Sequence, residues 1–122
     1  VCHDTTTPMI DKKSEGEFAA GKGPALTIGP AIHNKLLDWL IETAKKEDIP
    51  FQHGAEGRNT GTDTDNFAFS NGGVPSALIS LPLRYMHTTV ESIAIDDVEH
   101  TINLMYQAVV NFKTDFNFKF IE

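Results

Sequence analysis

The stretch VPSALISLPLRYMH, residues 74–87, joins an apolar run to a cluster of polar side chains. Residues 74–81 are apolar or small without alternation, which predicts a strand that is buried on both faces of a sheet. Arg84, Tyr85 and His87 follow directly. Because ligands of open α/β sheets gather at the carboxyl ends of the strands, these polar residues are the first candidates for a functional site.

The segments before this stretch alternate between strand and helix patterns. Short strands are predicted at residues 25–28 and 49–54, an amphipathic helix at 31–47 and a short helix at 63–71. Pro30 suits the first turn of the longer helix, because its missing N–H would be unpaired there anyway. Residues 5–23 have no sustained period and are predicted to be an exposed loop.

The segments after the stretch complete the pattern. VESIAI, residues 90–95, alternates and predicts a half-exposed strand. Asp96 with Glu99 resembles a capping box at the start of a final helix. Apolar residues then recur along that helix with alternating spacings of four and three residues, namely Val98, Ile102, Met105, Val109 and Phe112. The alternation predicts one α/β domain over residues 1–122, with some parallel strand pairing.

Composition limits the classes of partner. The chain has 122 residues, 40% of them hydrophobic, enough for one compact core. Its 10 Lys and Arg stand against 17 Asp and Glu, and the net charge of -7 disfavours nucleic acid and anionic membranes as partners. Cys2 is the only cysteine and cannot form an internal disulfide, so we expect a reducing compartment, the cytoplasm. No run approaches the about 18 apolar residues of a membrane span.

The candidate site residues each have an ordinary alternative. His87 is suited to zinc, but a lone histidine in this position is more often a hydrogen-bonded loop residue. Arg84 suits a carboxylate clamp or a surface ion pair. The cluster GTDTDN, residues 61–66, lacks the Gly and the distal Glu of a calcium loop. We expect it to form a turn and cap a helix through Thr62 or Asp63, and a binding-loop role stays open.

Several motifs together resemble one family. The motifs are GKGPALTIGPAI (residues 21–32), IPFQ (49–52), GTD (61–63), GVPSALISLPLRYMH (73–87) and VE (90–91). Their order and spacing are similar to those of the glutamyl and tetrahedral aminopeptidases, co-catalytic zinc or cobalt metallopeptidases often labelled endoglucanases. The resemblance covers nearly the whole chain. It implies the C-terminal part of a catalytic domain that is folded as a three-layer α/β/α sandwich.

The resemblance also implies roles for particular residues. His87 would be a terminal ligand of one of two divalent metal ions, zinc or cobalt, with manganese as a third option. Asp63 and Arg84 are the candidates for substrate binding. The remaining metal ligands, the Glu that serves as general base and a dimerisation domain are expected upstream of Val1, so no catalytic base is expected within the chain. A homo-oligomer built from dimers, up to a dodecamer, is implied as well.

The expected function is therefore the removal of N-terminal residues from peptides by a longer enzyme. By itself the chain would be inactive, because one imidazole holds a divalent ion too weakly. It would also expose a sheet edge and apolar surface, so self-association is expected. A glycoside hydrolase is one alternative, although it needs two carboxylates at a sugar cleft, and Trp39 lies on a helix predicted to face the core. A non-catalytic interaction module that keeps only the fold is the other.

Overall fold

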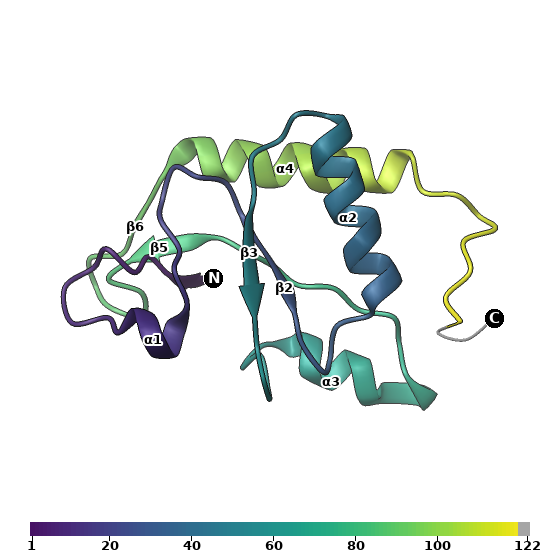
Figure 1. The fold of residues 1–122 in the computed structure, drawn as a ribbon, viewed down its shortest axis with the longest axis horizontal. Helices are drawn as coiled ribbons and strands as arrows, with labels where there is room; N and C mark the ends of the chain where they lie inside the picture. The colour runs from purple at the N-terminus through teal and green to yellow at the C-terminus, as the bar shows by residue number, and fades with distance from the viewer. Residues whose placement is uncertain (120–122) are drawn as a thin grey trace.

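The computed structural model describes residues 1–119 and shows two three-stranded sheets joined by one extended segment (Figure 1). Only Leu81 separates strand β4 (Ile79–Ser80) from strand β5 (Pro82–Arg84). β4 is the edge of a sheet ordered β3-β2-β4, whereas β5 is the centre of a sheet ordered β1-β5-β6. Residues 78–84, which we call the spine strand, therefore belong to both sheets.

The other strands pair with the spine strand or with each other. β2 (Ala25–Ile28) is parallel to β3 (Gln52–Ala55) and antiparallel to β4. β1 (Cys2–His3) is parallel to β5, and β6 (Ser92–Ile93) is antiparallel to β5. The prediction of an α/β fold with some parallel pairing is confirmed.

Two longer helices and β2 enclose the hydrophobic core. Helix α2 (Asn34–Lys46) packs against β2 and against helix α4 (Ile95–Val110). The indole N–H of Trp39 on α2 donates to the carbonyl of Ala108 on α4 at 3.1 Å. The buried apolar residues of this core are Leu26, Ile32, Leu37, Leu40, Ala44, Ile49, Leu104 and Ala108. None of the helices in residues 1–119 is long and apolar enough to cross a membrane.

Two short helices lie outside the core. α1 (Lys12–Glu15) interrupts the segment that was expected to be a loop, and Asp11 caps it by accepting the N–H of Lys13 at 3.0 Å. α3 (Asp63–Phe69) runs into a 3-10 turn at residues 70–72, so the short helix predicted at 63–71 is confirmed. Gly72 has a positive φ, as expected at a helix exit.

The longer predicted helix begins later than expected, at Asn34 rather than at residue 31. The N–H of Ile32 bonds back to the carbonyl of Gly29 at 3.0 Å, and the N–H of His33 bonds to Ser76 at 2.8 Å. These bonds fix a turn before the helix, so Pro30 lies outside the first helical turn. The hydrogen bond from His33 to the distant Ser76 thus outweighs the local preference of Pro30 for the first turn of a helix.

The apolar run that predicted a doubly buried strand is only partly buried. Within residues 74–81 only Ile79 and Ser80 belong to a paired strand, and Val74 is 45% exposed. Residues 76–79 are half-buried. The prediction is wrong for this part of the chain because, among residues 1–119, the run has a strand partner along only one edge at Ile79. The strand predicted at 90–95 is also shorter, with both residues of β6 exposed.

The start of α4 differs from its prediction in a way that matters for the whole fold. Ala94 is the residue before the helix, and no side chain caps it. The expected capping box of Asp96 and Glu99 is therefore wrong, because both residues lie inside the helix. Asp97 is fully buried instead, and its carboxylate accepts the N–H groups of Gly21 and Gly23, each at 2.7 Å.

Gln52 holds the same loop from the other side. Its amide accepts the N–H of Ala19 at 3.0 Å, and its NH₂ group donates to the carbonyls of Ala19 at 3.0 Å and Gly23 at 2.7 Å. We call Asp97 and Gln52 the loop clamp. The clamp fastens residues 19–23 to α4 and to β3, so several of the sequence motifs meet in one hydrogen-bonded structure.

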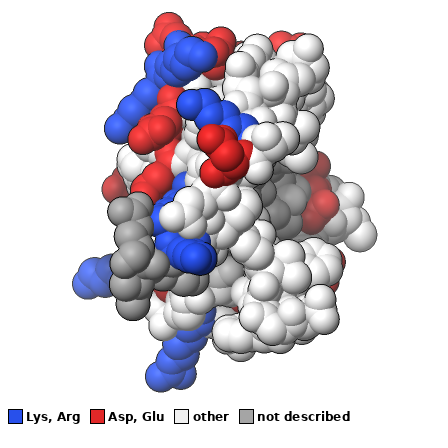
Figure 2. Space-filling view, turned by 90° about the vertical axis from the view of Figure 1, so that its right-hand side faces the viewer, with Lys and Arg blue, Asp and Glu red and all other residues white. Residues whose placement is uncertain are grey.

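The apolar residues that predicted α4 mostly face outward. Leu104 and Ala108 are buried, whereas Ile102, Met105 and Val109 are 63%, 53% and 74% exposed. Figure 2, which looks from the right-hand side of Figure 1, shows all the Lys and Arg side chains in view on the left or in the centre, whereas the right is mostly uncharged apart from a few acidic groups. An exposed row of apolar residues such as that on α4 is typical of a contact with another polypeptide segment.

The clamp predicts unequal effects at two adjacent acids. Asp97→Asn should lower the free energy of unfolding by about 2–3 kcal/mol, because an amide cannot accept both buried N–H groups as the carboxylate does. Asp96→Asn removes the same charge from an exposed position in the same helix turn and should cost less than about 1 kcal/mol. Urea denaturation of the two variants measures the difference. Equal stabilities would show that the buried carboxylate does not hold the loop.

Two glycines of the clamped loop provide a second test. A Cβ on Gly23 would lie 2.0 Å from the carbonyl oxygen of Pro50, whereas a Cβ on Gly21 would meet nothing within 4 Å. Both glycines have similar positive φ values, 87° and 85°, so the backbone cost of Ala, about 1–2 kcal/mol, is shared. Gly23→Ala should therefore destabilise the fold well beyond Gly21→Ala in thermal denaturation. A similar melting temperature for both variants would contradict the close approach of Gly23 to Pro50.

Candidate functional site

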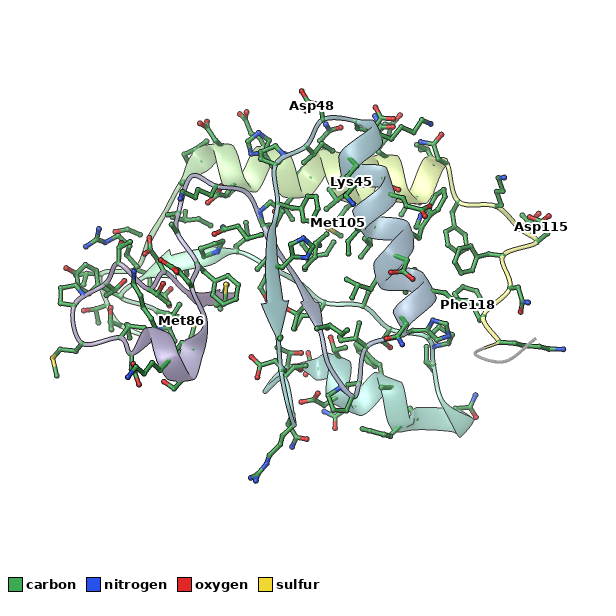
Figure 3. All side chains as sticks on the ribbon, in the orientation of Figure 1. Lys45, Asp48, Met86, Met105, Asp115 and Phe118 are labelled. Carbon is green, nitrogen blue, oxygen red and sulfur yellow. The ribbon has the colours of Figure 1, made fainter. Side chains whose placement is uncertain are left out.

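The candidate site lies in the turn that follows β5. Tyr85 and His87 both adopt left-handed backbone conformations, with φ of 54° and 62°. Such conformations are costly for residues with a Cβ and persist where the surrounding structure enforces them. Met86 lies between the two residues, and Figure 3 shows it in the loops beside α1. The imidazole of His87 is exposed.

Hydrogen bonds within the turn hold this conformation. The backbone N–H of His87 donates to a carboxylate oxygen of Glu91 at 2.5 Å. The hydroxyl of Thr88 donates to the carbonyl of Tyr85 at 2.6 Å and accepts the N–H of Val90 at 3.2 Å. Glu91 therefore fixes the backbone of His87 and leaves its ring nitrogens for other partners.

The neighbouring strand end carries a second acid. β1 and β5 are parallel, so Asp4 and Arg84 come to the same end of the sheet, and the N–H of Asp4 bonds to the carbonyl of Leu83 at 2.9 Å. The guanidinium carbon of Arg84 lies 5.7 Å from the ring centre of Tyr85, a cation–π distance. Arg84, Tyr85 and His87 are thus brought together in one turn, with Asp4 beside it.

Asp4 is buried and tightly held. Its carboxylate accepts the N–H and the hydroxyl of Thr6 at 2.7 and 2.6 Å and the N–H of Ala20 at 3.0 Å. Burial works to raise the pKa of Asp4, but these hydrogen bonds and the charge of Arg84 outweigh it and lower the pKa below its ordinary value. Asp4 consequently remains ionised at neutral pH, as an anchor for the loop between β1 and α1.

Cys2 and Asp4 do not act together with His3 as a metal site. Burial raises the pKa of the Cys2 thiol to about 11, and the carboxylate of Asp4 is already used by Thr6 and Ala20. Within residues 1–119, no three His, Cys, Asp or Glu side chains are arranged to hold a metal ion. His87 is therefore suited by chemistry and exposure to supply one metal ligand, and the described chain does not complete a site around it.

Asp63 lies away from this turn. It is the first residue of α3, which follows β3, and β3 runs opposite to β4 and hence to β5. The carboxyl ends of β3 and β5 therefore lie at opposite ends of the strands, and α3 lies below them in Figure 1 while β5 and β6 lie to the left. No hydrogen bond or ion pair among the described residues joins Asp63 to Arg84 or His87.

The cluster around Asp63 forms a capped turn, as its sequence predicts. Thr62 accepts the N–H of Thr64 at 3.3 Å and caps α3. Asp65 accepts the N–H groups of Thr60 and Gly61, each at 3.0 Å, and the hydroxyl of Thr60 at 2.9 Å. These bonds, that from the Thr60 N–H most of all, lower the pKa of Asp65. Its lone pairs are used within the turn.

Sequence reasoning missed two residues of the site. In the sequence, Glu91 stands out only as part of a family motif, whereas its carboxylate accepts the backbone N–H of His87. Asp4 is not among the candidates from the sequence, although Asp followed by Thr-Thr is typical of a turn closed by side-chain hydrogen bonds. The left-handed Tyr85 has no signal in the sequence.

Comparison with known proteins identifies the family. The profile of the M42 glutamyl aminopeptidases matches residues 1–104, most of the chain. The chain belongs to the M42 glutamyl aminopeptidase family. The matched residues of this M42 chain include the loop clamp, the spine strand and the turn with His87. The last turns of α4 and the segment after it lie beyond the match.

Individual relatives agree with this assignment. The M42 chain is 44% identical over 84 residues to a lysyl aminopeptidase of Pyrococcus furiosus, a match that covers 69% of this chain and 24% of that protein. The TET aminopeptidase of Thaumarchaeota archaeon SCGC AB-539-E09 superposes with a TM-score of 0.83 at 25% identity, covering 94% of this chain and 32% of that one. An endoglucanase of Thermotoga maritima gives a TM-score of 0.64 at 28% identity, covering 89% and 31%.

These comparisons confirm the resemblance drawn from the motifs, including the endoglucanase label on one neighbour. They confirm the α/β fold class as well. The M42 chain spans only about a quarter to a third of the length of these relatives, 24% to 32%.

The buried Asp4 makes stability depend on pH. Its folded pKa lies below its ordinary value of 3.8, so its contribution is fully present above that value and is lost as the pH falls through the folded pKa. The urea midpoint of the unchanged protein should therefore fall as the pH is lowered from about 5 through the folded pKa of Asp4. Asp4→Asn should have a lower urea midpoint at neutral pH, and its midpoint should fall less on acidification. Asp38→Asn, at an exposed site on α2, should keep the full acid dependence. An unchanged acid dependence in Asp4→Asn would contradict the assigned role.

Proposed function

We propose that this chain is part of a metal-dependent aminopeptidase, in which His87 is a terminal ligand of one of two divalent metal ions. The observation that carries the proposal is the exposed imidazole of His87, held on a strained left-handed turn by the carboxylate of Glu91. Membership of the M42 family supports it, as does the similarity to a lysyl aminopeptidase.

His87 is the one histidine within the family motifs quoted above, and it meets the requirements of a metal ligand. Its backbone is fixed, its ring is exposed, and its neighbours Arg84 and Tyr85 form one wall of the turn. The bound ions, zinc, cobalt or manganese, would polarise the scissile carbonyl and lower the pKa of a water molecule. The other ligands and the general base would come from polypeptide outside these 122 residues, which is why the chain alone is expected to be inactive.

Arg84 is the better supported of the two substrate-binding candidates. It lies three residues before His87 and next to the exposed ring of Tyr85, so its guanidinium can reach a carboxylate bound near the metal. Asp63 remains a proposal with less support, because α3 begins at the opposite end of the strands. Peptides with a free N-terminus are the proposed substrates, a dimer-based homo-oligomer the proposed assembly, and the cytoplasm the proposed compartment.

The endoglucanase label of one neighbour is the reason to consider glycoside hydrolysis. The one tryptophan of the sequence is not available for sugar binding. Trp39 donates its N–H to Ala108 and packs edge-on against Phe112 and Phe116, at 5.9 and 6.3 Å between ring centres, so its ring is not free as a sugar platform. Peptide hydrolysis is the better supported activity.

Separate substitutions of two histidines test the proposal in the longer protein that contains this chain. His87→Ala should lower the hydrolysis of an aminoacyl p-nitroanilide by about 100-fold or more, since even groups that only support a metal ligand contribute about 10–100-fold. Chelation with 1,10-phenanthroline should abolish the activity, and added zinc, cobalt or manganese should restore it.

His53→Ala is the matched control, because His53 is also exposed but lies on β3. This variant should keep both the activity and the bound metal measured by mass spectrometry. Full activity and unchanged metal content in His87→Ala would refute the ligand assignment. Hydrolysis of a β-glucan with no hydrolysis of peptides would favour the glycosidase instead.

A further inference from the structure

The segment that follows α4 lies outside the part of the chain that matches the family profile, which ends at residue 104. We call residues 112–119 the aromatic strap, because three phenylalanines lie within it, namely Phe112, Phe116 and Phe118. In Figure 1 the strap descends beside α2 at the right-hand edge of the molecule. Membership of the family therefore does not account for it.

Aromatic rings fasten one face of the strap to its own molecule. Phe112 and Phe116 pack edge-on against Trp39 of α2, at 5.9 and 6.3 Å between ring centres. Phe118 packs edge-on against His33 at 5.5 Å, and its carbonyl accepts a hydrogen bond from Nε2 of His33 at 2.8 Å. The inner face of the strap is thus occupied.

The other edge of the strap is open. Residues 115–119 alternate between exposed polar side chains and half-buried phenylalanines, as a half-exposed strand does. The carbonyl of Phe118 points to His33, and backbone groups of successive residues in an extended chain point to opposite edges. The N–H and carbonyl of Asn117 therefore point away from α2, and within residues 1–119 no hydrogen bond uses them.

The strap is complementary to a second copy of itself. When two straps run antiparallel with Asn117 opposite the partner's Asn117, Asp115 lies opposite the partner's Lys119, and Phe116 lies opposite the partner's Phe118. Opposite charges and aromatic rings in such directly paired positions stabilise an antiparallel pair, and like charges destabilise it.

The two charges cannot neutralise each other within one copy. Asp115 and Lys119 are four residues apart, which is about 13 Å in an extended chain. Both side chains are exposed, and no ion pair joins them in the described chain. In Figure 3, Asp115 lies at the right-hand edge of the molecule, whereas Phe118 lies nearer to α2. The charged groups are thus placed for a partner outside the molecule.

We propose that the aromatic strap is a contact between two copies of this chain, in which residues 116–118 pair antiparallel about a two-fold axis at Asn117. An ion pair of Asp115 with the partner's Lys119 flanks the pairing on each side. Such a contact uses the same surface of both copies, as is usual for two-fold symmetry. The order of charges along the strap matches its own reverse, which favours a second copy over an unrelated partner.

The strap contact adds to the homo-oligomer proposed above and rests on that part of the proposed function. Three paired residues bury little surface, so the contact is expected to join copies that other interfaces already hold together. In the single chain the N–H of Lys119 bonds to Oδ1 of Asn117 at 2.9 Å. Pairing replaces this bond by one to the carbonyl of the partner's Asp115.

Cysteine cross-linking in the longer protein locates the contact. Asn117→Cys places two thiols at a hydrogen-bonded antiparallel pair, whose Cα atoms lie about 5.5 Å apart, within the range of a disulfide. Mild oxidation should join two copies through residue 117, as identified by mass spectrometry of the linked peptides. Asn111→Cys is the matched control, because Asn111 is also exposed but lies at the end of α4, outside the strap. A yield at residue 117 no higher than at residue 111 would overturn the proposal.

Charge reversal in the Asn117→Cys protein tests the register. Asp115→Lys or Lys119→Asp alone sets like charges opposite each other and should lower the yield of the disulfide about threefold or more. The two changes together restore opposite charges and should restore the yield. Because the two residues do not meet within one copy, this rescue reports a contact between copies. A double variant that cross-links as poorly as the single variants would reject the antiparallel register.

The outcome is separable from that of the proposed function. Neither measurement uses peptide hydrolysis or bound metal, so a longer protein without aminopeptidase activity that forms the disulfide through residue 117 and shows the rescue would still support the strap contact. An active homo-oligomer that forms no more disulfide at residue 117 than at residue 111 would keep the proposed function and reject the strap contact.

Discussion

The fold depends on one buried carboxylate. Asp97 lies in the first turn of α4 and accepts two backbone N–H groups from the loop of residues 21–23, far away in the sequence. A buried charge is costly unless it is satisfied, and here both oxygens are used. Through this contact α4, the loop before β2 and, by way of Gln52, the start of β3 are placed relative to one another.

The loop clamp gives a physical reason for motifs that first served only as a family resemblance. Gly23 allows the chain to pass within contact distance of Pro50, where a side chain would collide with a carbonyl. Gln52 closes the same junction with its amide. These residues therefore support the position of β2 and, across the sheet, of the spine strand. The catalytic chemistry proposed for the family lies elsewhere, at the far end of that strand.

The turn after β5 carries the residues of the proposed metal site. Two left-handed residues with side chains follow each other there with only Met86 between them, and a carboxylate holds the second. Strain of this kind is compatible with a stable protein only when the strand leading into the turn is well fixed. β1 and β6 fix it from both edges, whereas the β4 part of the same strand has a partner on one edge among the described residues. The part of the strand that is paired on both edges thus carries the proposed metal ligand.

The sequence by itself determined the α/β class, α2 and α3 to within a few residues, the capped turn at Thr62 and the family, because periodicity and local hydrogen bonding suffice for these. It also placed Arg84, Tyr85 and His87 after a strand. Only the tertiary structure decided that Asp97 clamps a loop rather than caps a helix, that Asp63 lies at the opposite end of the strands, and that the apolar residues of α4 face outward. The reason is that each of these depends on strand direction or on a partner distant in the chain, and neither leaves a local pattern in the sequence.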